Sequence, residues 1–486
     1  MGHVHRLAGP PALNLDGSVA DAVGEARPWR RALAWLLLLG PFFFASYGFA
    51  TWVSGQRSDV GVILFAWERH IPLLPWTIVP YWLIDLLYGV SLFLCKTRRQ
   101  LDTHACRLLA CQLIAVICFL LFPLRCTFER GEVTGAFGWM FALLMSFDQP
   151  YNQAPSLHIA LLVVLLEPYL RAVPRAWHGV VHAVALLIGV SVLTTWQHHF
   201  FDIPTGLWLG CFAAWLFPTD APSPLRHARL RREAAQQRLA LAYAGAALAI
   251  GWLAADAGGA WLWLLWPAGS LALVAVIYLS LDGDSFAKRA DGSMPFAVRC
   301  LFAPYLLAAW LNSRWWTRRL AAADPVAPGI LLGRLPTPGE LKHLGVAAVV
   351  DLCAELPCPT PGLRHTVVPM LDLVVPCPAQ IEQAVLALVE DRQAGPVLVC
   401  CALGFARSAL VAAAYLLRAG AVSSAAEAVA QVQKGRPSVV LGRAHVDLLC
   451  RWNNSTRGQE QPSGLRHEVR ITSLILDSSA EARNGG

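Results

Sequence analysis

The segment VLVCCALGFARSALVAAAYLL, residues 397–417, decides the fold of the C-terminal part of the chain. Its first residues form a short apolar run, which predicts a buried central strand. The alanine- and leucine-rich run after Arg407 predicts a helix, and a short loop containing Gly404 lies between them. Backbone N–H groups of such a loop and of the helix N-terminus point at one spot, so the segment predicts an anion-binding cradle. Its loop residues are Ala402, Leu403, Gly404, Phe405 and Ala406.

The side chains around this cradle suit the transfer of a phosphoryl group to cysteine. Cys401 ends the strand, where the positive ends of loop and helix favour its thiolate. Arg407 can bind two phosphate oxygens, and Ser408 can donate a hydrogen bond to the thiolate. The leaving oxygen needs an acid, and Asp372, in a loop 29 residues upstream, is the candidate. Asp351, at the end of another strand, is the competing carboxylate, and we interpret it as structural.

Short apolar runs alternate with helical patterns on both sides of the cradle. Together they predict one α/β domain over residues 328–453, with a central sheet flanked by helices. The predicted strands are 329–333, 346–352, 365–368 and 396–400, and the predicted helices include 379–392, 408–419, 423–433 and 443–453. The polar tail 454–486 is predicted to be disordered.

The spacing Cys401-x5-Arg407-Ser408, with Gly404 between, resembles the dual-specificity and tyrosine phosphatase superfamily. The resemblance runs from about 328 to 453 and includes Arg436-Pro437 downstream. It implies a phosphocysteine on Cys401, hydrolysed with Asp372 as acid and then base. Cys400 stands where that family usually has histidine. The alternative is a purely structural role, with a buried strand cysteine beside a helix-capping arginine.

The rest of the chain has the composition of a membrane protein. Over the whole sequence only 15% of residues are charged and 56% are hydrophobic, whereas soluble proteins carry about 25% charge. Eight stretches approach the length of about 20 apolar residues that a spanning helix needs. They are 32–53, 73–95, 108–123, 156–173, 178–196, 200–217, 239–255 and 260–280. Two shorter runs, 137–147 and 300–313, are predicted to lie at the membrane interface.

Lysines and arginines in the loops give the orientation. Fifteen fall in loops that are inside if the N-terminus is inside, and four fall in the outer loops. Eight spans then return the C-terminal half to the cytoplasm, as in a multi-pass protein of the inner (cell) membrane. The predicted parts are a cytoplasmic segment 1–31, a membrane domain 32–217, a basic loop 218–238, two further helices 239–280, an interfacial linker 281–327, the phosphatase-like domain 328–453 and the tail 454–486.

The net charge of +7 is explained by these loops, and no basic stripe interleaved with aromatics predicts nucleic-acid binding. The thirteen cysteines contain no C-x-x-C pair, so neither a metal site nor a disulfide framework is predicted. No cofactor is expected. The sequence does not indicate an oligomeric state.

Two polar clusters interrupt the apolar stretches at the same predicted face of the membrane. One is Pro155-Ser156-Leu157-His158, and the other is His198-His199-Phe200-Phe201-Asp202. His198 and Asp202 are four residues apart and share a helix face, so the carboxylate can orient the imidazole to attack phosphorus. His158 can then protonate the leaving oxygen. The alternative is that these histidines are interfacial residues that pack against Trp196 and Trp208.

The two clusters resemble the P-S-x-H and H-x3-D motifs of the type 2 phosphatidic acid phosphatase superfamily, especially its inositol- and sphingolipid-phosphotransferase branch. The resemblance covers about 60–217 and implies a phosphohistidine on His198. The family's Lys-x6-Arg-Pro motif is not evident, and Val192 replaces an expected arginine. Ser156 and Arg125 are the candidates for phosphate binding on this side. The order of the two parts resembles bacterial fusions of such a membrane domain with a dual-specificity phosphatase domain.

These observations predict a membrane-anchored cysteine-dependent phosphatase. The uncharged loop 402–406 favours a singly phosphorylated substrate, either phosphoprotein Tyr, Ser or Thr, or a lipid head group. The alternative is a lipid phosphatase or phosphotransferase that uses His198, with the C-terminal domain accessory. A third possibility is a binding module without catalysis. The expected partners are the phospholipid bilayer and the phosphorylated protein or phospholipid.

Overall fold

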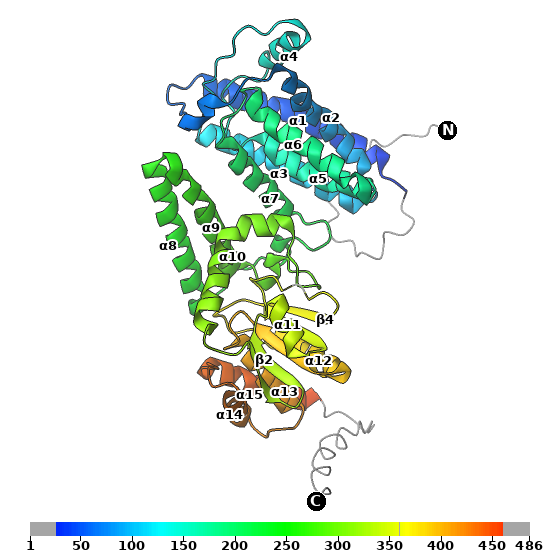
Figure 1. Cartoon of the computed structure of the whole chain (residues 1–486), viewed down its shortest axis with the longest axis vertical. Coiled ribbons are helices and arrows are strands. Elements are labelled where there is room, and N and C mark those ends of the chain that lie inside the picture. The colour runs from blue at the N-terminus through cyan, green and yellow to red at the C-terminus, as the bar shows by residue number, and fades with distance from the viewer. Residues whose placement is uncertain (1–25, 359, 460–486) are drawn as a thin grey trace, which may run out of the picture.

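A helical bundle is followed by a smaller α/β domain in the computed structural model, which describes residues 26–358 and 360–459 (Figure 1). The described residues before 318 form ten α-helices. They are α1 (Trp29–Gly55), α2 (Ile78–Leu94), α3 (Arg98–Leu121), α4 (Gly135–Met145), α5 (Leu157–Ala172), α6 (His178–Thr194), α7 (Asp202–Leu216), α8 (Ala234–Ala257), α9 (Leu265–Ser280) and α10 (Phe296–Thr317).

Ion pairs show which helix ends lie together at one end of the bundle. Arg31, near the start of α1, pairs with Asp102, near the start of α3, at 2.6 Å. Arg107 of α3 pairs with Glu167, near the end of α5, and donates to the Phe217 carbonyl just after α7, at 2.7 Å. The starts of α1 and α3 therefore lie beside the ends of α5 and α7. We call this end, marked by Arg31 and Arg107, the basic end.

Seven helical segments are long and apolar enough to cross a bilayer, judged by length and composition. Six overlap predicted spans, namely Trp29–Gly55, Pro75–Leu94, Arg98–Leu121, Arg175–Thr194, Ala234–Ala257 and Gly259–Ser280. The predicted stretches 156–173 and 200–217 form the shorter helices α5 and α7, of 16 and 15 residues. The seventh segment is α10, which extends beyond the predicted run 300–313 because arginine at 299 and 314 continues a helix rather than ending it.

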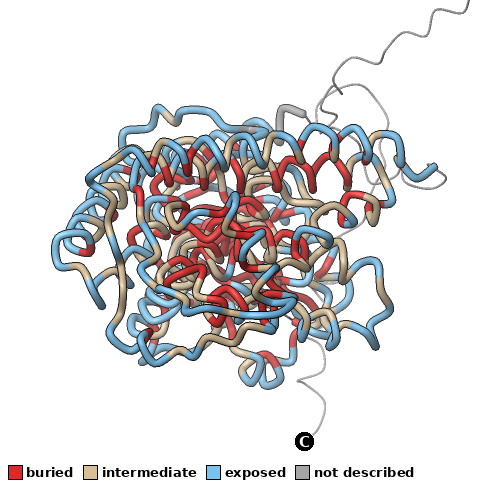
Figure 2. The backbone as a smooth tube through the Cα atoms, turned by 90° about the horizontal axis from the view of Figure 1, so that it is seen from above, coloured by how far each residue is buried: buried red, intermediate tan, exposed pale blue. Residues whose placement is uncertain are grey.

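The outer surface of the bundle is apolar. Leu37, Leu186 and Leu248 are 66%, 69% and 75% exposed, and exposed backbone runs along the outer helices around a buried centre (Figure 2). Such broad exposure of leucine is costly in water and favourable in a lipid environment. Together with the candidate spans, this surface indicates a membrane protein.

The C-terminal domain contains a five-stranded sheet in the order β1-β2-β5-β3-β4. Only β1 and β2 are antiparallel, and the other neighbours are parallel. The strands are β1 (Ala323–Ala327), β2 (Ile330–Arg334), β3 (Ala348–Cys353), β4 (Arg364–Met370) and β5 (Val397–Cys401). The helices are α11 (Pro338–Leu344), α12 (Pro378–Asp391), α13 (Arg407–Arg418), α14 (Ala425–Gly435) and α15 (Arg443–Gln459).

This architecture confirms the predicted α/β domain but gives it different boundaries in the sequence. Strand β1 lies in the segment that the sequence assigned to the linker, because Ala-Asp-Pro-Val-Ala has no strand pattern of its own and is held by pairing with β2. Residues 454–459 continue helix α15 and are not part of a disordered tail. Most of the predicted N-terminal segment, and the tail from 460 on, lie outside the described residues.

The linker between α9 and α10 is built into the α/β domain. The side chain of Lys288 is fully buried, pairs with Asp351 at the end of β3 and donates to the Cys353 carbonyl at 2.7 Å. The Gly292 carbonyl accepts from the Cys358 amide at 2.8 Å. A buried ion pair that crosses the junction holds the linker against the α/β domain, since breaking a buried pair is strongly destabilising.

Candidate active sites

The Cys401 loop has the form of the predicted anion cradle. Cys401 ends β5, and the chain turns through Gly404, whose φ of +75° is in the left-handed region, before α13 begins at Arg407. A Cβ on Gly404 would lie 2.5 Å from the Gly333 carbonyl carbon, so glycine lets the loop pack against β2. The Gly404 amide donates to Cys401 Sγ at 3.3 Å, and Ser408 Oγ lies 3.3 Å from the same sulfur. The loop therefore surrounds the sulfur with hydrogen-bond donors.

Arg407 is buried beneath this loop and is held by carboxylates. It makes two hydrogen bonds with Glu355, of 2.7 and 2.8 Å, and a third with the Met370 carbonyl, of 2.9 Å. Its Nη2 also lies 3.0 Å from Asp372 Oδ1. The remaining donor, Nε, is buried and has no hydrogen-bond partner among the described residues. The guanidinium is thus fixed in orientation while one of its N–H groups stays available.

In this network the pKa of Asp372 is raised and the pKa of Glu355 is lowered. Burial raises the pKa of Asp372, an effect that the Arg407 charge opposes and the Glu355 charge supports. Burial also acts to raise the pKa of Glu355, but the Arg407 guanidinium outweighs it and the net pKa is lowered. Glu355 is therefore the permanent anion that holds Arg407, and Asp372 keeps its proton to higher pH than an ordinary aspartate.

Glu355 was not singled out from the sequence. It lies 52 residues from Arg407, in a loop after β3, and only the parallel pairing of β3 with β5 brings the two together. The one available signal was an acidic residue directly after a buried strand, beside Asp351. Asp351 has the structural role that we expected, because it accepts from the Cys353 amide at 2.9 Å and pairs with Lys288 and His365.

Cys400, in the position before Cys401, points away from the cradle. It is fully buried in a separate apolar cluster with Val349 and Leu398, on the other face of the sheet from Cys401. Burial raises the pKa of its thiol well above the ordinary range. Cys400 is therefore a packing residue, and the thiol that faces the loop donors is that of Cys401.

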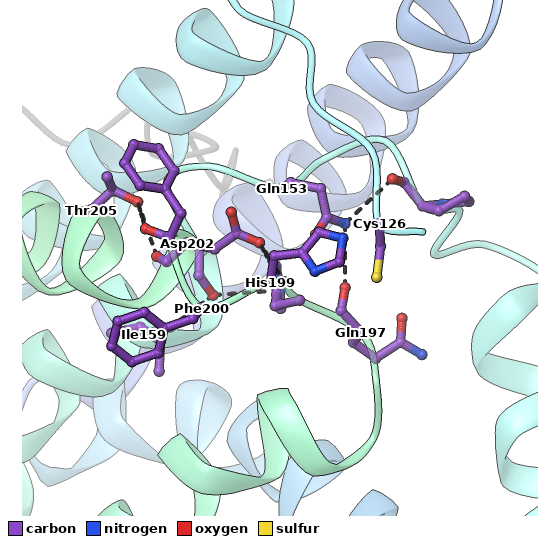
Figure 3. Close-up of polar contacts among 12 residues, drawn as sticks. Cys126, Gln153, Ile159, Gln197, His199, Phe200, Asp202 and Thr205 are labelled. Atoms are coloured by element: carbon purple, nitrogen blue, oxygen red, sulfur yellow. Dashed lines mark hydrogen bonds and ion pairs between the residues drawn. The ribbon is translucent and has the colours of Figure 1, made fainter. Parts of the chain in front are cut away.

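At the end of the bundle opposite the basic end, the second predicted site comes together. His198 Nδ1 lies 3.0 Å from Asp202 Oδ2, and Nε2 lies 3.4 Å from Ser156 Oγ. Asp202 also accepts from the His199 amide at 3.1 Å. The His158 ring centroid lies 6.3 Å from that of His198, and the His158 ring stacks on Tyr81. Figure 3 shows the turn before α7, where Gln153 donates to the Gln197 carbonyl and Asp202 begins the helix.

Two glycines allow the histidine-bearing segments to meet. Gly206 and Gly210 lie one turn apart on α7, and their α-carbons face the backbone of α5. A Cβ on Gly210 would lie 2.6 Å from the Ala160 carbonyl oxygen, and one on Gly206 would overlap the Ser156 carbonyl. This close small-xxx-small crossing sets Ser156 and His158 opposite His198 and Asp202.

Arg125, the predicted phosphate-binding cation of this second site, makes no contact with the histidines among the described residues. Arg125 is exposed, and no contact joins its side chain to Ser156, His158 or His198 among the described residues. Arg130 donates to the carbonyls of Thr195 and Trp196, at 2.7 and 3.1 Å. The second histidine of the pair, His199, accepts from the Thr127 amide and pairs with Glu68, so it is a structural residue.

Instead of cations, hydroxyl groups and a carboxylate face the histidines. Asp148 accepts from Tyr47 at 2.6 Å and from Tyr81 at 3.3 Å. Both tyrosines and Asp148 line one cavity with His158 and His198. The sequence analysis missed this group, because its members come from α1, α2 and the segment after α4, about 100 residues apart, and no motif joins them.

Comparison with known proteins finds similarity over the C-terminal domain. Residues 335–455 match the family described as "Dual specificity phosphatase, catalytic domain". Human DUSP28 is 28% identical over 28% of this chain and 99% of its own, with a TM-score of 0.26. Tk-PTP in its active form is 25% identical over 27% of this chain and 97% of its own, with a TM-score of 0.26. PTPMT1, crystallised in complex with PI(5)P, is 20% identical over 29% of this chain and 100% of its own, with a TM-score of 0.27.

Proposed function

We propose that this chain, whose residues 335–455 match the dual-specificity phosphatase catalytic domain, is a membrane-anchored phosphatase of the protein-tyrosine/dual-specificity type that acts through a phosphocysteine on Cys401. The observation that carries the proposal is the geometry at sulfur. Gly404 N–H and Ser408 Oγ both lie 3.3 Å from Cys401 Sγ, and the unpartnered Nε of Arg407 is held beneath the same loop.

The residues divide the reaction into two steps. In the first, Cys401 Sγ forms a bond to phosphorus, the P–O bond of the ester breaks, and Asp372 gives its proton to the leaving oxygen. In the second, water attacks phosphorus, the Asp372 carboxylate takes a proton from it, and the P–S bond breaks to release inorganic phosphate. Loop amides and Arg407 stabilise the charge on the phosphoryl oxygens throughout. Ser408 donates to the thiolate as it leaves.

Cys401→Ser in the full chain, purified in detergent micelles, tests this proposal. Hydrolysis of an aryl phosphate should fall by about 10³-fold or more, because serine is a far weaker nucleophile at neutral pH. The matched control is Cys400→Ser, which changes the neighbouring buried thiol and should keep the activity of the unmodified chain to within about threefold. Unchanged hydrolysis by Cys401→Ser would overturn the proposal.

A second function, lipid phosphatase or phosphotransferase activity at His198, is favoured by a specific arrangement. His198 is oriented by Asp202 at Nδ1, and its Nε2 faces the cavity that His158 shares. The ring centroids are 6.3 Å apart and both imidazoles line one cavity, so the two histidines can act on the same phosphoryl group. In this proposal His198 forms the P–N bond and His158 protonates the leaving oxygen.

His198→Ala and Cys401→Ser, separately and combined, assign this activity. With phosphatidic acid in mixed micelles, a His198-dependent site predicts release of diacylglycerol that survives Cys401→Ser and falls by about 10³-fold in the double variant. If Cys401→Ser alone removes all release, the histidine site has no hydrolytic role on that lipid.

We further propose that the N-terminus and the phosphatase domain share the cytoplasmic side. Trp215, near the end of α7, donates to the Ser285 carbonyl of the linker at 2.8 Å, which supports a phosphatase domain at the basic end. Both flanks of α10 bond to that domain, through Gly292 before it and Ser313 near its end. This supports α10 as an interfacial helix rather than a ninth span (Figure 1). Protease access to the C-terminus in intact cells tests the arrangement.

A further inference from the structure

We infer that the substrate of the Cys401 site is a membrane phospholipid with a single phosphomonoester, presented along the surface of α8, α9 and α10. The inference rests on the proposed function of Cys401. Its basis is that both catalytic segments, the loop that carries Asp372 and the loop that begins at Cys401, are attached directly to these apolar helices.

The loop that carries Asp372 is anchored on α9. Tyr278, two residues before the end of that helix, donates from Oη to the Asp372 carbonyl at 3.1 Å. The preceding residue, Leu371, is buried in one apolar cluster with Val274 and Ile277 of α9, and Val374 packs on the same cluster. The position of the catalytic acid is therefore set by a helix of the bundle and not only by the phosphatase domain.

The Cys401 loop is anchored on α10. Ser313 is buried and donates to the Ala402 carbonyl at 2.5 Å. Leu403 packs in the same apolar cluster as Ala309, one turn earlier on α10. Nucleophile and acid are thus held by two neighbouring helices of the bundle.

Aromatic rings fill the corner between the three helices. Tyr243 of α8 lies 5.5 Å from Tyr278 and 6.0 Å from Tyr305 of α10, between ring centroids. Tyrosine is enriched where a membrane meets water, because its ring is apolar and its hydroxyl is polar. The ring of Tyr278, which contacts the acid loop, thus marks the level at which a lipid head group would lie.

Across α10 from these anchors, the helix has an apolar and exposed face. Leu307, Trp310 and Leu311 occupy positions i, i+3 and i+4, so they share one face, on the side of α10 away from Ala309 and Ser313. Leu307 and Leu311 are 58% and 53% exposed. Near the helix end Arg318 lies over the Trp315 ring at 4.1 Å, a pairing that suits the interfacial region. Acyl chains can lie on this face while the head group reaches the catalytic loop.

The rim of the site itself is apolar. Leu373, next to the catalytic acid, is exposed and has a φ of +56°. Val440 is exposed, and its amide donates to the Phe405 carbonyl at 2.9 Å. Within the loop 401–407 the only charged side chain is Arg407. Such a rim matches a hydrocarbon-bearing substrate with one phosphate better than a polar phosphopeptide.

The test uses the full chain with His198→Ala, so that only the Cys401 site contributes, and Cys401→Ser in the same background as the blank. The substrates are dioleoyl phosphatidic acid in phosphatidylcholine vesicles, its soluble dihexanoyl analogue, a phosphotyrosyl peptide and an aryl phosphate. We expect kcat/KM for the vesicle lipid to exceed that for the soluble lipid and the peptide by at least about tenfold, because binding of acyl chains adds apolar contact area.

Leu311→Asp should lower the ratio of vesicle-lipid to aryl-phosphate turnover by at least about tenfold, because a charge on that face opposes contact with acyl chains. Val389→Asp, at an equally apolar exposed position of α12 that packs on the sheet and α13, should leave this ratio unchanged. Faster Cys401-dependent cleavage of the peptide, or an unchanged ratio in Leu311→Asp, overturns the lipid inference and leaves the phosphatase in place. Loss of all Cys401-dependent cleavage, aryl phosphate included, overturns the proposed function instead.

Discussion

The two candidate sites differ in how the chain builds them. The Cys401 cradle is one continuous segment, completed by Glu355 and Asp372 from neighbouring loops. The His198 cluster is assembled from segments before α5 and before α7, with hydroxyls from α1 and α2. The first holds a buried guanidinium, and the second holds buried carboxylate and phenol groups. A buried guanidinium is therefore present for a phosphate group at the first site only, and the second depends on its histidines being correctly oriented.

The largest expected effect is at the assembled site, where orientation depends on one carboxylate. Asp202→Asn should lower His198-dependent release of diacylglycerol by about 10³ to 10⁴-fold, because the imidazole then has no anion to fix its tautomer. Aryl-phosphate hydrolysis at Cys401 should not change. Radiometric or mass-spectrometric lipid assays in the Cys401→Ser background measure the first quantity. Equal losses at both sites would show that the two are not separable.

Next in size is the junction between the two regions. Lys288→Met should destabilise the phosphatase domain by about 3–5 kcal/mol, because the buried Asp351 loses its lysine partner and keeps only the longer contact with His365. The control Lys342→Met, at an exposed position of α11, should change stability by less than about 0.5 kcal/mol. Loss of aryl-phosphatase activity against urea concentration, in the full chain in micelles, reports both. A Lys288→Met chain as stable as the control would contradict the buried pair.

A smaller effect is expected from the carboxylate that holds Arg407. Glu355→Gln keeps the shape of the side chain and removes its charge, so Arg407 loses its fixed partner and kcat/KM should fall by about 10 to 100-fold. The surface pair Arg418–Glu382 provides the control, since Glu382→Gln removes a half-exposed partner of arginine and should have no effect on kcat/KM. Equal rates for the two variants would remove Glu355 from the site.

The smallest effect is a displacement of the pH profile. Asp372 acts while protonated, and its pKa is raised by burial, so the rate of the first step should fall with rising pH at a higher pH than an ordinary aspartate would give. Because the Glu355 charge contributes to that rise, Glu355→Gln should move the falling limb to lower pH. The rate of phosphocysteine formation in single-turnover experiments, measured against pH, gives this falling limb. Asp372→Asn should abolish the fall in rate with rising pH.

Local pattern predicted much of this molecule. The strand, loop and helix around Cys401 follow from an apolar run, one glycine and a helix-forming run, and each residue acts near its sequence neighbours. The pairing of His198 with Asp202 was also predicted, but it forms across the turn between α6 and α7 and not along a helix face, as we had expected. Glu355, Lys288 and Asp148 could not be read in this way, since each acts on a group many residues distant and has no local signature. Strand β1 was missed because its pairing with β2, not its composition, makes it a strand.

Lys288 of the linker affects where the chain can be truncated and how its domains can be exchanged. A fragment begun at the conventional edge of the α/β fold would contain every strand but would lack Lys288, and the buried Asp351 would keep only the longer contact with His365. Residues 283–292 belong, energetically, to a domain whose first strand begins thirty residues later. An exchange of catalytic domains between membrane anchors would have to carry this segment along. The helical bundle and the α/β domain therefore depend on each other through this linker, which a domain boundary drawn from the sequence would leave out.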